Sequence, residues 1–257
     1  MLLLHALPLA AHGATVSEYF DGVTSGPGVW KMRHYLEVYE QHLRRFSGTP
    51  VAMAEIGVYS GGSLKMWRWL FGEAAKLYGI DVSAKTRAYE LNKNYGRPQK
   101  MFIGDKTHPQ FWAELKRSVP DGLDVIVDDG GHAPWQQIAG FKLAWPLIRP
   151  GGVMIIEDVN QGNFTQYITG KFLHARTGIM SFRPAKKFDK LQESESLIKL
   201  AHSPVQRELA HVSFYPQMIV VEKMARPRSE IVAEKHGSEW QPPEFWAEAK
   251  ASAAAMQ

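Results

Sequence analysis

The feature that most constrains the fold is an alternation of short apolar runs with amphipathic segments through the middle of the chain. The apolar runs are VAMAEIGV, KLYGIDV, KMFIGD, LDVIVDD and GGVMIIEDV, which begin at residues 51, 76, 100, 123 and 151. Continuous apolar runs of this kind are typical of strands buried on both faces of a parallel sheet. The segments between them, 61–71, 84–94, 108–119 and 133–148, have helical patterns. This alternation predicts an α/β fold with a doubly wound, mostly parallel sheet.

The flanks of this core have different patterns. Residues 31–46 place Tyr35, Val38, Tyr39, His42 and Leu43 at helical spacing, which predicts a helix before the first strand. After the last apolar run, residues 163–177 and 190–203 are predicted to be helical. Residues 211–224 read as two strands broken near Pro216, which is typical of a hairpin. From residue 226 the chain becomes polar and then Ala-rich, and we interpret residues 226–257 as a peripheral tail.

Composition narrows the classes of protein that fit. The 257 residues, 45% of them hydrophobic, suffice for one large domain with a full core. The absence of cysteine excludes disulfides and thiolate metal sites. The net charge of +4 comes from scattered basic residues, so we predict no nucleic-acid partner and read the basic stretch 183–190 as a solvated face.

Targeting signals are weak. No apolar run approaches the ~20 residues that span a bilayer, so we predict no membrane association. The apolar start MLLLHALPLAAHGA lacks the positive residues that open a secretory signal. We expect a cytoplasmic protein, and secretory targeting by residues 1–14 stays open.

A glycine loop follows the first apolar run. It reads EIGVYSGGSL, with Glu55, Gly57 and Gly61 spaced as E-x-G-x-x-x-G. Glycines allow positive φ and close approach of a ligand to the backbone, and ligands bind at this open end of a doubly wound sheet. The dinucleotide fingerprint G-x-G-x-x-G and the lysine of a P-loop are both absent. Alone, the loop is equally consistent with a plain strand-to-helix turn.

Acidic residues stand at or near the ends of successive predicted strands: Glu55, Asp81, Asp105 and Asp128. A carboxylate at the end of the second strand can accept hydrogen bonds from a ribose diol. Each acid singly is also consistent with a helix N-cap or a turn. Because strand ends of this topology line one crevice, the set as a whole predicts a ligand site.

Together these pieces resemble class I S-adenosylmethionine-dependent methyltransferases, and more narrowly the metal-dependent sugar O-methyltransferases of the macrocin and mycinamicin type. The resemblance rests on EIGVYSGGS, GID, IGD, DDGGH, LIRPGGVMIIEDV, VSFY and IVVEK, and it covers roughly residues 31–223. It implies a Rossmann-like sheet of seven strands with a C-terminal antiparallel hairpin strand. The family has Ser at the position of Gly131. The implied contacts of S-adenosylmethionine are Glu55, Gly57, Tyr59, Gly61, Ser63, Asp81, Asp105 and Asp128.

The resemblance also assigns a role to DDGGH and IIEDV. Asp129, Glu157 and Asp158 would hold Mg²⁺ or Mn²⁺, which prefers oxygen ligands, and His132 would be the general base. Adjacent residues of a regular strand point to opposite faces, so Glu157 and Asp158 can share one ion only where the strand has ended or bulged. The competing interpretation is that Asp129 and Asp158 cap helices and that His132 packs on Trp135. His34, His42 and His108 have no comparable context, and we expect ordinary surface or core positions for them.

The expected function is an S-adenosylmethionine- and Mg²⁺-dependent O-methyltransferase of natural product biosynthesis, acting on a sugar-like or other small-molecule hydroxyl. The alternatives are a cephalosporin-hydroxylase-like enzyme of the same fold and a non-catalytic S-adenosylmethionine-binding module. The expected organisation is an N-terminal segment 1–30 that contributes to the substrate site, a methyltransferase domain 31–225 and the tail. A lid is expected over about residues 164–203, where two glycines and the basic stretch interrupt the strand–helix rhythm. A homo-oligomer is left open.

Overall fold

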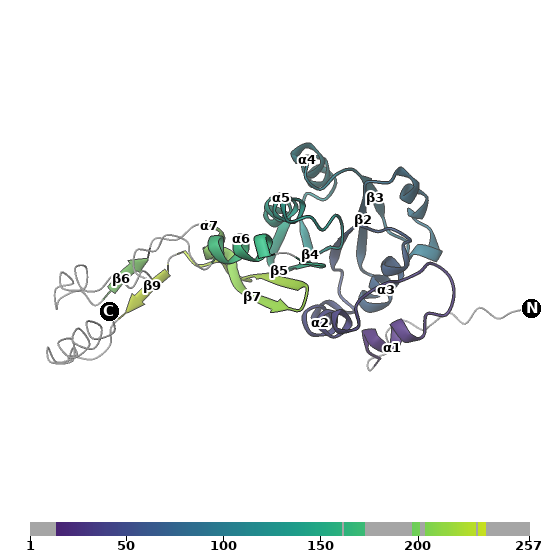
Figure 1. Cartoon of the computed structure of the whole chain (residues 1–257), viewed down its shortest axis with the longest axis horizontal. Helices are drawn as coiled ribbons and strands as arrows, with labels where there is room; N and C mark the ends of the chain where they lie inside the picture. The colour runs from purple at the N-terminus through teal and green to yellow at the C-terminus, as the bar shows by residue number, and fades with distance from the viewer. Residues whose placement is uncertain (1–13, 161, 173–196, 201–203, 230, 235–257) are drawn as a thin grey trace, which may run out of the picture. The chain divides into compact units, whose positions relative to one another are not determined.

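The structure is a computed structural model that describes residues 14–160, 162–172, 197–200, 204–229 and 231–234. It divides into two units, Met1–Leu173 with Glu208–Pro227 and His174–Arg207 with Arg228–Gln257. The larger unit holds a seven-stranded sheet ordered β3-β2-β1-β4-β5-β8-β7 (Figure 1). Its strands are β1 (Ala52–Ile56), β2 (Lys76–Asp81), β3 (Lys100–Ile103), β4 (Leu123–Asp128), β5 (Ile148–Ile156), β7 (Leu209–Tyr215) and β8 (Met218–Lys223).

The strand directions confirm the predicted fold class. The pairs β1–β2, β2–β3, β1–β4 and β4–β5 are parallel, whereas β8 is antiparallel to both β5 and β7. The turn between β7 and β8 contains Pro216 and Gln217, and Gln217 has a φ of 57°. The expected C-terminal hairpin is therefore present.

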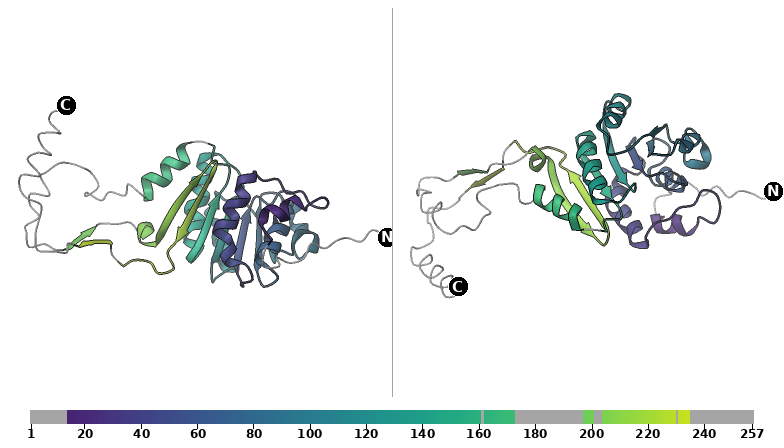
Figure 2. Two further views of the ribbon diagram at one scale, coloured as in Figure 1. Left: turned by 90° about the horizontal axis from the view of Figure 1, so that it is seen from below. Right: turned by 45° about the horizontal axis from the view of Figure 1, so that its top comes forward.

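Helices cover both faces of the sheet (Figures 1 and 2). One face carries α1 (Val16–Asp21), α2 (Arg33–Leu43) and α3 (Gly62–Phe71), and the other carries α4 (Pro109–Ser118), α5 (Pro134–Ala144) and α6 (Gly162–Phe172). Val125 and Val127 of β4 join the core cluster that includes α2 and α3, while the intervening Ile126 is fully buried outside this cluster. Alternate side chains thus serve opposite faces, which is why the strands read as continuous apolar runs.

Three helical predictions in the larger unit need correction or trimming. Residues 84–94 form no α-helix but two short 3₁₀ helices, Ala84–Tyr89 and Lys93–Tyr95. The break has a local cause, because Leu91 has a φ of 57° and the Asn92 side chain accepts the N–H of Asn94. Further 3₁₀ turns, Arg44–Phe46 and Trp145–Leu147, end the helices predicted over 31–46 and 133–148.

The smaller unit contains a two-stranded antiparallel sheet of β6 (Leu197–Leu200) and β9 (Ile231–Glu234), and α7 (Pro204–Glu208) spans the boundary of the two units. The helix predicted over 190–203 is therefore wrong for residues 197–200. The short run LIKL suits either a helix or a strand, and pairing with residues distant in the sequence decides between them. The segment interpreted as a tail supplies the partner strand β9.

Parts of several predictions lie outside the described residues. These are residues 1–13, with the question of a targeting segment, residues 173–196 and 201–203 of the expected lid, and residue 230 with residues 235–257 of the tail. Residues 164–172 of the expected lid belong to α6, whose Phe164 and Ile168 are fully buried. Among the helices within the described residues, none has both the length and the apolar character needed to cross a bilayer.

Candidate active site

The register of the central strands brings the predicted site residues to one edge. Ile56 of β1 pairs with Ile80 of β2 and with Asp128 of β4, and Asp128 pairs in turn with Ile156 of β5. The residues that follow these partners therefore lie at one edge of the sheet; they are Gly57, Asp81, Asp129 and Glu157. This is the carboxyl edge, where ligands bind in doubly wound sheets.

The glycine loop requires glycine at its first position. Gly57 has a φ of 88°, and a Cβ atom there would lie 2.1 Å from the carbonyl oxygen of Asp129. A side chain at this position would push the two neighbouring loops apart. Tyr59 follows with a φ of 48° and donates its N–H to Asp81 Oδ2 at 3.0 Å. The loop is thus tied to the end of β2 as well as to the end of β4.

The acids after β2 and β3 are held by backbone donors. Asp81 also accepts the N–H of Ser83 at 2.8 Å, and Asp105 accepts the N–H of Thr107 at 2.8 Å. This backbone hydrogen bond lowers the pKa of Asp105. Both acids therefore stabilise turns, which is one of the two interpretations that the sequence allowed. Each carboxylate still has lone pairs that can accept further hydrogen bonds.

A cavity of about 770 Å³ lies along this edge. The predicted cofactor residues that line it are Gly57, Tyr59, Ser63, Asp81 and Asp105. It is also lined by His132 and by the three acids predicted to hold the metal, Asp129, Glu157 and Asp158. Glu55, Gly61 and Asp128 are not among its lining residues, and their cofactor contacts stay predictions.

Glu55 and Asp128 have buried partners instead. The Glu55 carboxylate accepts the Ser63 hydroxyl at 2.7 Å, and burial raises its pKa to about 7. Asp128 forms an ion pair with Lys106 Nζ at 2.7 Å, and both side chains are almost fully buried. Glu55 thus ties β1 to the start of α3, and Asp128 ties the end of β4 to Lys106.

Three of the predicted residues converge at the end of β4 and β5. One ligand atom from each of Asp129, His132 and Asp158 lies within 4.8 Å of the others, and His132 Nε2 is 3.4 Å from Asp158 Oδ2. The strand β5 ends at Ile156, and Asp158 has a φ of 52°. The strand has therefore ended before the acid pair, as the sequence required if both acids were to face one site.

Glu157 is turned toward two residues that sequence reasoning missed. Lys31 Nζ donates to Glu157 Oε2 at 2.8 Å and to Asp129 Oδ2 at 2.6 Å, while the Tyr39 hydroxyl donates to Glu157 Oε1 at 2.6 Å. Burial raises the pKa of Glu157 to about 8, against the opposing effect of Lys31. Burial by itself would lower the pKa of Lys31, but Glu157 and Asp129 outweigh it and the pKa is raised. Lys31 is thus a buried cation shared by two carboxylates.

The helix α2 supplies the hydroxyl donors of the site. Tyr35 and Tyr39 are one turn apart, and the Tyr35 hydroxyl donates to Asp158 Oδ1 at 2.9 Å. Their helical spacing predicted a helix, and both rings are buried. The only sequence signal for the second role is the polar end of each side chain, since a buried Tyr hydroxyl needs a partner.

Three of the four predicted residues fit a hard divalent cation, whereas Glu157 already has hydrogen-bond partners. Asp129 and Asp158 offer carboxylate oxygens in the cavity, and His132 lies beside them. Both Glu157 oxygens already accept hydrogen bonds from Lys31 and Tyr39. Glu157 would bind a cation directly only if one of its oxygens also accepted the metal or lost its hydrogen bond to Lys31 or Tyr39.

The sheet order, the glycine loop and the acids at the carboxyl edge define a class I methyltransferase fold. Residues 54–159 match the model of the methyltransferase domain family. The chain is also similar to the MycE methyltransferase of the mycinamycin biosynthetic pathway in complex with Mg, SAH and mycinamycin VI. That likeness has a TM-score of 0.64 at 22% identity and covers 93% of this chain and 59% of that chain. At this identity it shows the fold.

The curated relatives confirm the family resemblance. An 8-demethyl-8-alpha-L-rhamnosyl tetracenomycin-C 2'-O-methyltransferase from Streptomyces olivaceus is 26% identical over 209 residues, or 78% of this chain and 53% of that protein. The demethylmacrocin O-methyltransferase of Streptomyces fradiae is 30% identical over 138 residues, or 51% of this chain and 33% of that protein. This chain therefore spans about half the length, or less, of the curated relatives it matches.

Proposed function

We propose that this chain is an S-adenosylmethionine- and Mg²⁺-dependent O-methyltransferase that acts on a hydroxyl of a sugar-like small molecule. The observation that carries the proposal is a single cavity with two chemically different ends. Asp81 lies on one side of the glycine loop, at the end of β2, and Asp129, His132 and Asp158 lie on its other side, after β4 and β5. A methyl donor and a hydroxyl acceptor need such adjoining sites, because the transfer is an in-line displacement.

The donor end is suited to a nucleoside with a charged tail. Asp81, at the end of β2, keeps free lone pairs for the two ribose hydroxyls, while Gly57 lets the glycine loop pack closely against the loop after β4. Asp105, at the end of β3, lines the same end. S-adenosylmethionine, when bound, supplies a methyl group already activated by its sulfonium.

The acceptor end is suited to removing a proton. His132 would take the proton of the acceptor hydroxyl as its oxygen bonds to the methyl carbon and the methyl carbon–sulfur bond breaks, with the electron pair leaving on the sulfur. Asp158 at 3.4 Å would stabilise the resulting imidazolium. Mg²⁺ held by Asp129 and Asp158, with Glu157 as a further candidate ligand, would supply Lewis acidity that lowers the pKa of that hydroxyl. Lys31 and Tyr39 keep Glu157 oriented, and Tyr35 does the same for Asp158.

Support for a sugar-like acceptor comes from the cavity rim and from the relatives. Trp30 lines the cavity and is 94% exposed, which leaves its ring free to stack on a sugar face. Through Trp30, the N-terminal segment would contribute to the acceptor site. Several relatives are named for methyl transfer to a sugar or its carrier, such as mycinamicin VI 2''-O-methyltransferase of Micromonospora griseorubida.

The test is transfer of a labelled methyl group from S-adenosylmethionine to paired acceptors, each a deoxysugar glycoside and its own aglycone. We expect labelling of glycosides alone, loss of transfer in EDTA, and recovery with Mg²⁺ or Mn²⁺. The control is S-adenosylmethionine binding by calorimetry, which should survive EDTA. Full transfer in excess EDTA would remove the metal from the proposal. Tight donor binding with no transfer across the panel would favour the non-catalytic module.

A further inference from the structure

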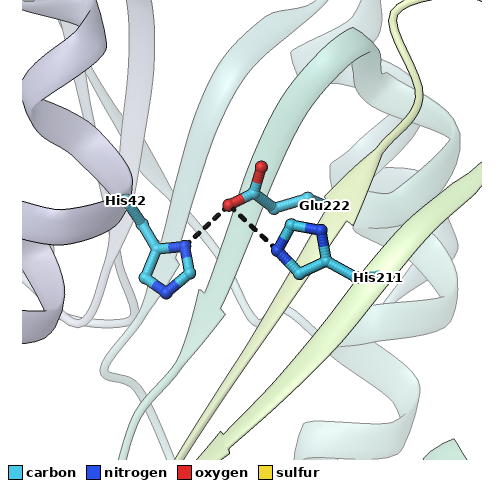
Figure 3. A group of neighbouring side chains, drawn as sticks. All are labelled: His42, His211 and Glu222. Atoms are coloured by element: carbon cyan, nitrogen blue, oxygen red, sulfur yellow. Dashed lines mark hydrogen bonds and ion pairs between the residues drawn. The ribbon is translucent and has the colours of Figure 1, made fainter.

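A second cluster of ligating side chains lies outside the cavity. It consists of His42 on α2, His211 on β7 and Glu222 on β8, all within the larger unit (Figure 3). None of the three lines the cavity described above. His42 and Glu222 are buried, with 5% and 6% of their side chains exposed, whereas His211 is 51% exposed. The cluster therefore opens to solvent on the side of His211.

We infer that His42, His211 and Glu222 form a binding site for a divalent transition-metal ion, with Zn²⁺ as the natural occupant. Glu222 Oε1 lies 2.6 Å from His42 Nδ1 and 3.5 Å from His211 Nε2. One ligand atom from each residue lies within 4.8 Å of the others. Ligands of tetrahedral Zn²⁺ are separated by roughly 3.4 Å when its bonds are about 2.1 Å long, a value inside the observed range.

The surrounding residues orient the two buried ligands. The other nitrogen of His42, Nε2, lies 2.7 Å from the Tyr215 hydroxyl, so a proton on Nε2 leaves the Nδ1 lone pair facing Glu222. Arg45 lies 2.8 Å from Glu222 Oε2 and leaves Oε1 facing the histidines. The Arg45 side chain is 47% exposed, so solvent screens its repulsion of a bound cation.

The ligand chemistry separates this site from the cavity. Two imidazoles with one carboxylate suit Zn²⁺ and its transition-metal neighbours, whereas the acids of the cavity suit Mg²⁺. Three protein ligands and an open side toward solvent leave the fourth position to water. Without a metal ion, Glu222 is hydrogen-bonded to His42 and ion-paired with Arg45, and the bond to His42 joins α2 to the β7–β8 hairpin.

Occupation of the site would act on the cavity through α2. That helix carries Tyr35 and Tyr39, whose hydroxyls donate to Asp158 and Glu157. A metal ion joining His42 to the hairpin fixes the last turn of α2 against the sheet. We therefore expect Zn²⁺ to stabilise the folded protein by mass action, whether or not the methyl transfer occurs.

The test uses the full chain stripped with a chelator and then dialysed. We expect one equivalent of Zn²⁺ to bind in a calorimetric titration and to raise the melting temperature, with Mg²⁺ unable to replace it. His211→Ala should weaken this binding at least roughly tenfold, a loss already typical of outer-shell partners. His211→Gln, which keeps the side-chain volume better, serves if the alanine variant folds poorly.

Two matched controls make the assignment specific. His34→Ala removes a histidine of the same helix outside the cluster, and Asp158→Asn alters the second group of ligating side chains. Both variants should keep the tight Zn²⁺ equivalent. Retention of that equivalent in the His211 variants, its loss in Asp158→Asn, or no saturable Zn²⁺ binding at all would each overturn the inference.

Discussion

Replacement of Lys31 with methionine should cost the protein several kcal/mol of unfolding free energy, because it leaves two carboxylates without their shared cation. Methionine keeps the length of the side chain and removes only its charge and donors. Lys31 is 3% exposed, and its partners Glu157 and Asp129 are 1% and 24% exposed. Breaking a buried pair by removing one partner costs about 3–5 kcal/mol. Partial hydration of Asp129 places the expected loss near the lower end, at about 3 kcal/mol.

The loss should depend on pH, and the sign follows from the carboxyl groups. Glu157 already has a pKa raised to about 8 by burial, and removal of Lys31 takes away the opposing effect. A carboxyl group whose pKa is raised in the folded state contributes stability below its unfolded pKa, and that stability is lost as the pH rises through the folded pKa. The deficit of the variant should therefore be small near pH 5 and largest above pH 8.

The assay is urea unfolding followed by tryptophan fluorescence at an acidic and an alkaline pH. Lys85→Met is the matched control, since it makes the same substitution at an exposed position and should change stability by no more than about 0.5 kcal/mol. A loss below about 1 kcal/mol for Lys31→Met at the alkaline pH would refute the view that Lys31 neutralises buried acids. A loss of equal size at both pH values would refute the assigned titration.

Three further predictions concern the cavity and its support. Asp81→Ala should weaken S-adenosylmethionine binding by on the order of 1–3 kcal/mol in calorimetry, because the ribose hydroxyls lose their acceptor, and unchanged affinity would rule that contact out. His132→Ala should lose roughly 10²–10⁴-fold in turnover and keep donor affinity, whereas a normal rate with a lowered melting temperature would make His132 a packing residue. Glu55→Gln should flatten the fall in stability of the wild type as pH rises through 7, since a pKa raised from 4.5 to about 7 makes ionisation cost about 3 kcal/mol. Parallel pH profiles of the unfolding free energy for wild type and Glu55→Gln would contradict this last assignment.

Much of the fold was accessible from the sequence because it depends on local periodicity. The five apolar runs and the helical patterns at 61–71, 108–119 and 133–148 each report which faces of a segment are buried. Where the pattern was weak, the prediction was wrong. Residues 84–94 form two 3₁₀ turns, and residues 197–200 form a strand, because local capping in one case and a distant partner in the other decided the outcome.

The residues of the candidate site also divide into those that the sequence predicted and those that only the tertiary structure placed. The sequence alone placed Gly57, Asp81, Asp129 and His132 at strand ends, and the topology rule then brought them to one edge. It assigned no role to Lys31, which lies 98 residues from Asp129 and 126 from Glu157 along the chain. A lysine within a helical pattern is ordinarily solvated, so nothing local marks it as buried.

By itself, then, the sequence determined the parallel sheet, the glycine turn and the acids at the strand ends, because each depends on residue type at a fixed spacing within one segment. Only the tertiary structure decided that α2 lends its hydroxyls to the acid pair and that Lys31 takes both Asp129 and Glu157. It likewise brought His42 beside Glu222. The physical reason is that a buried charge must find an opposite charge or a hydrogen bond wherever packing places one, and such partners share no spacing along the chain.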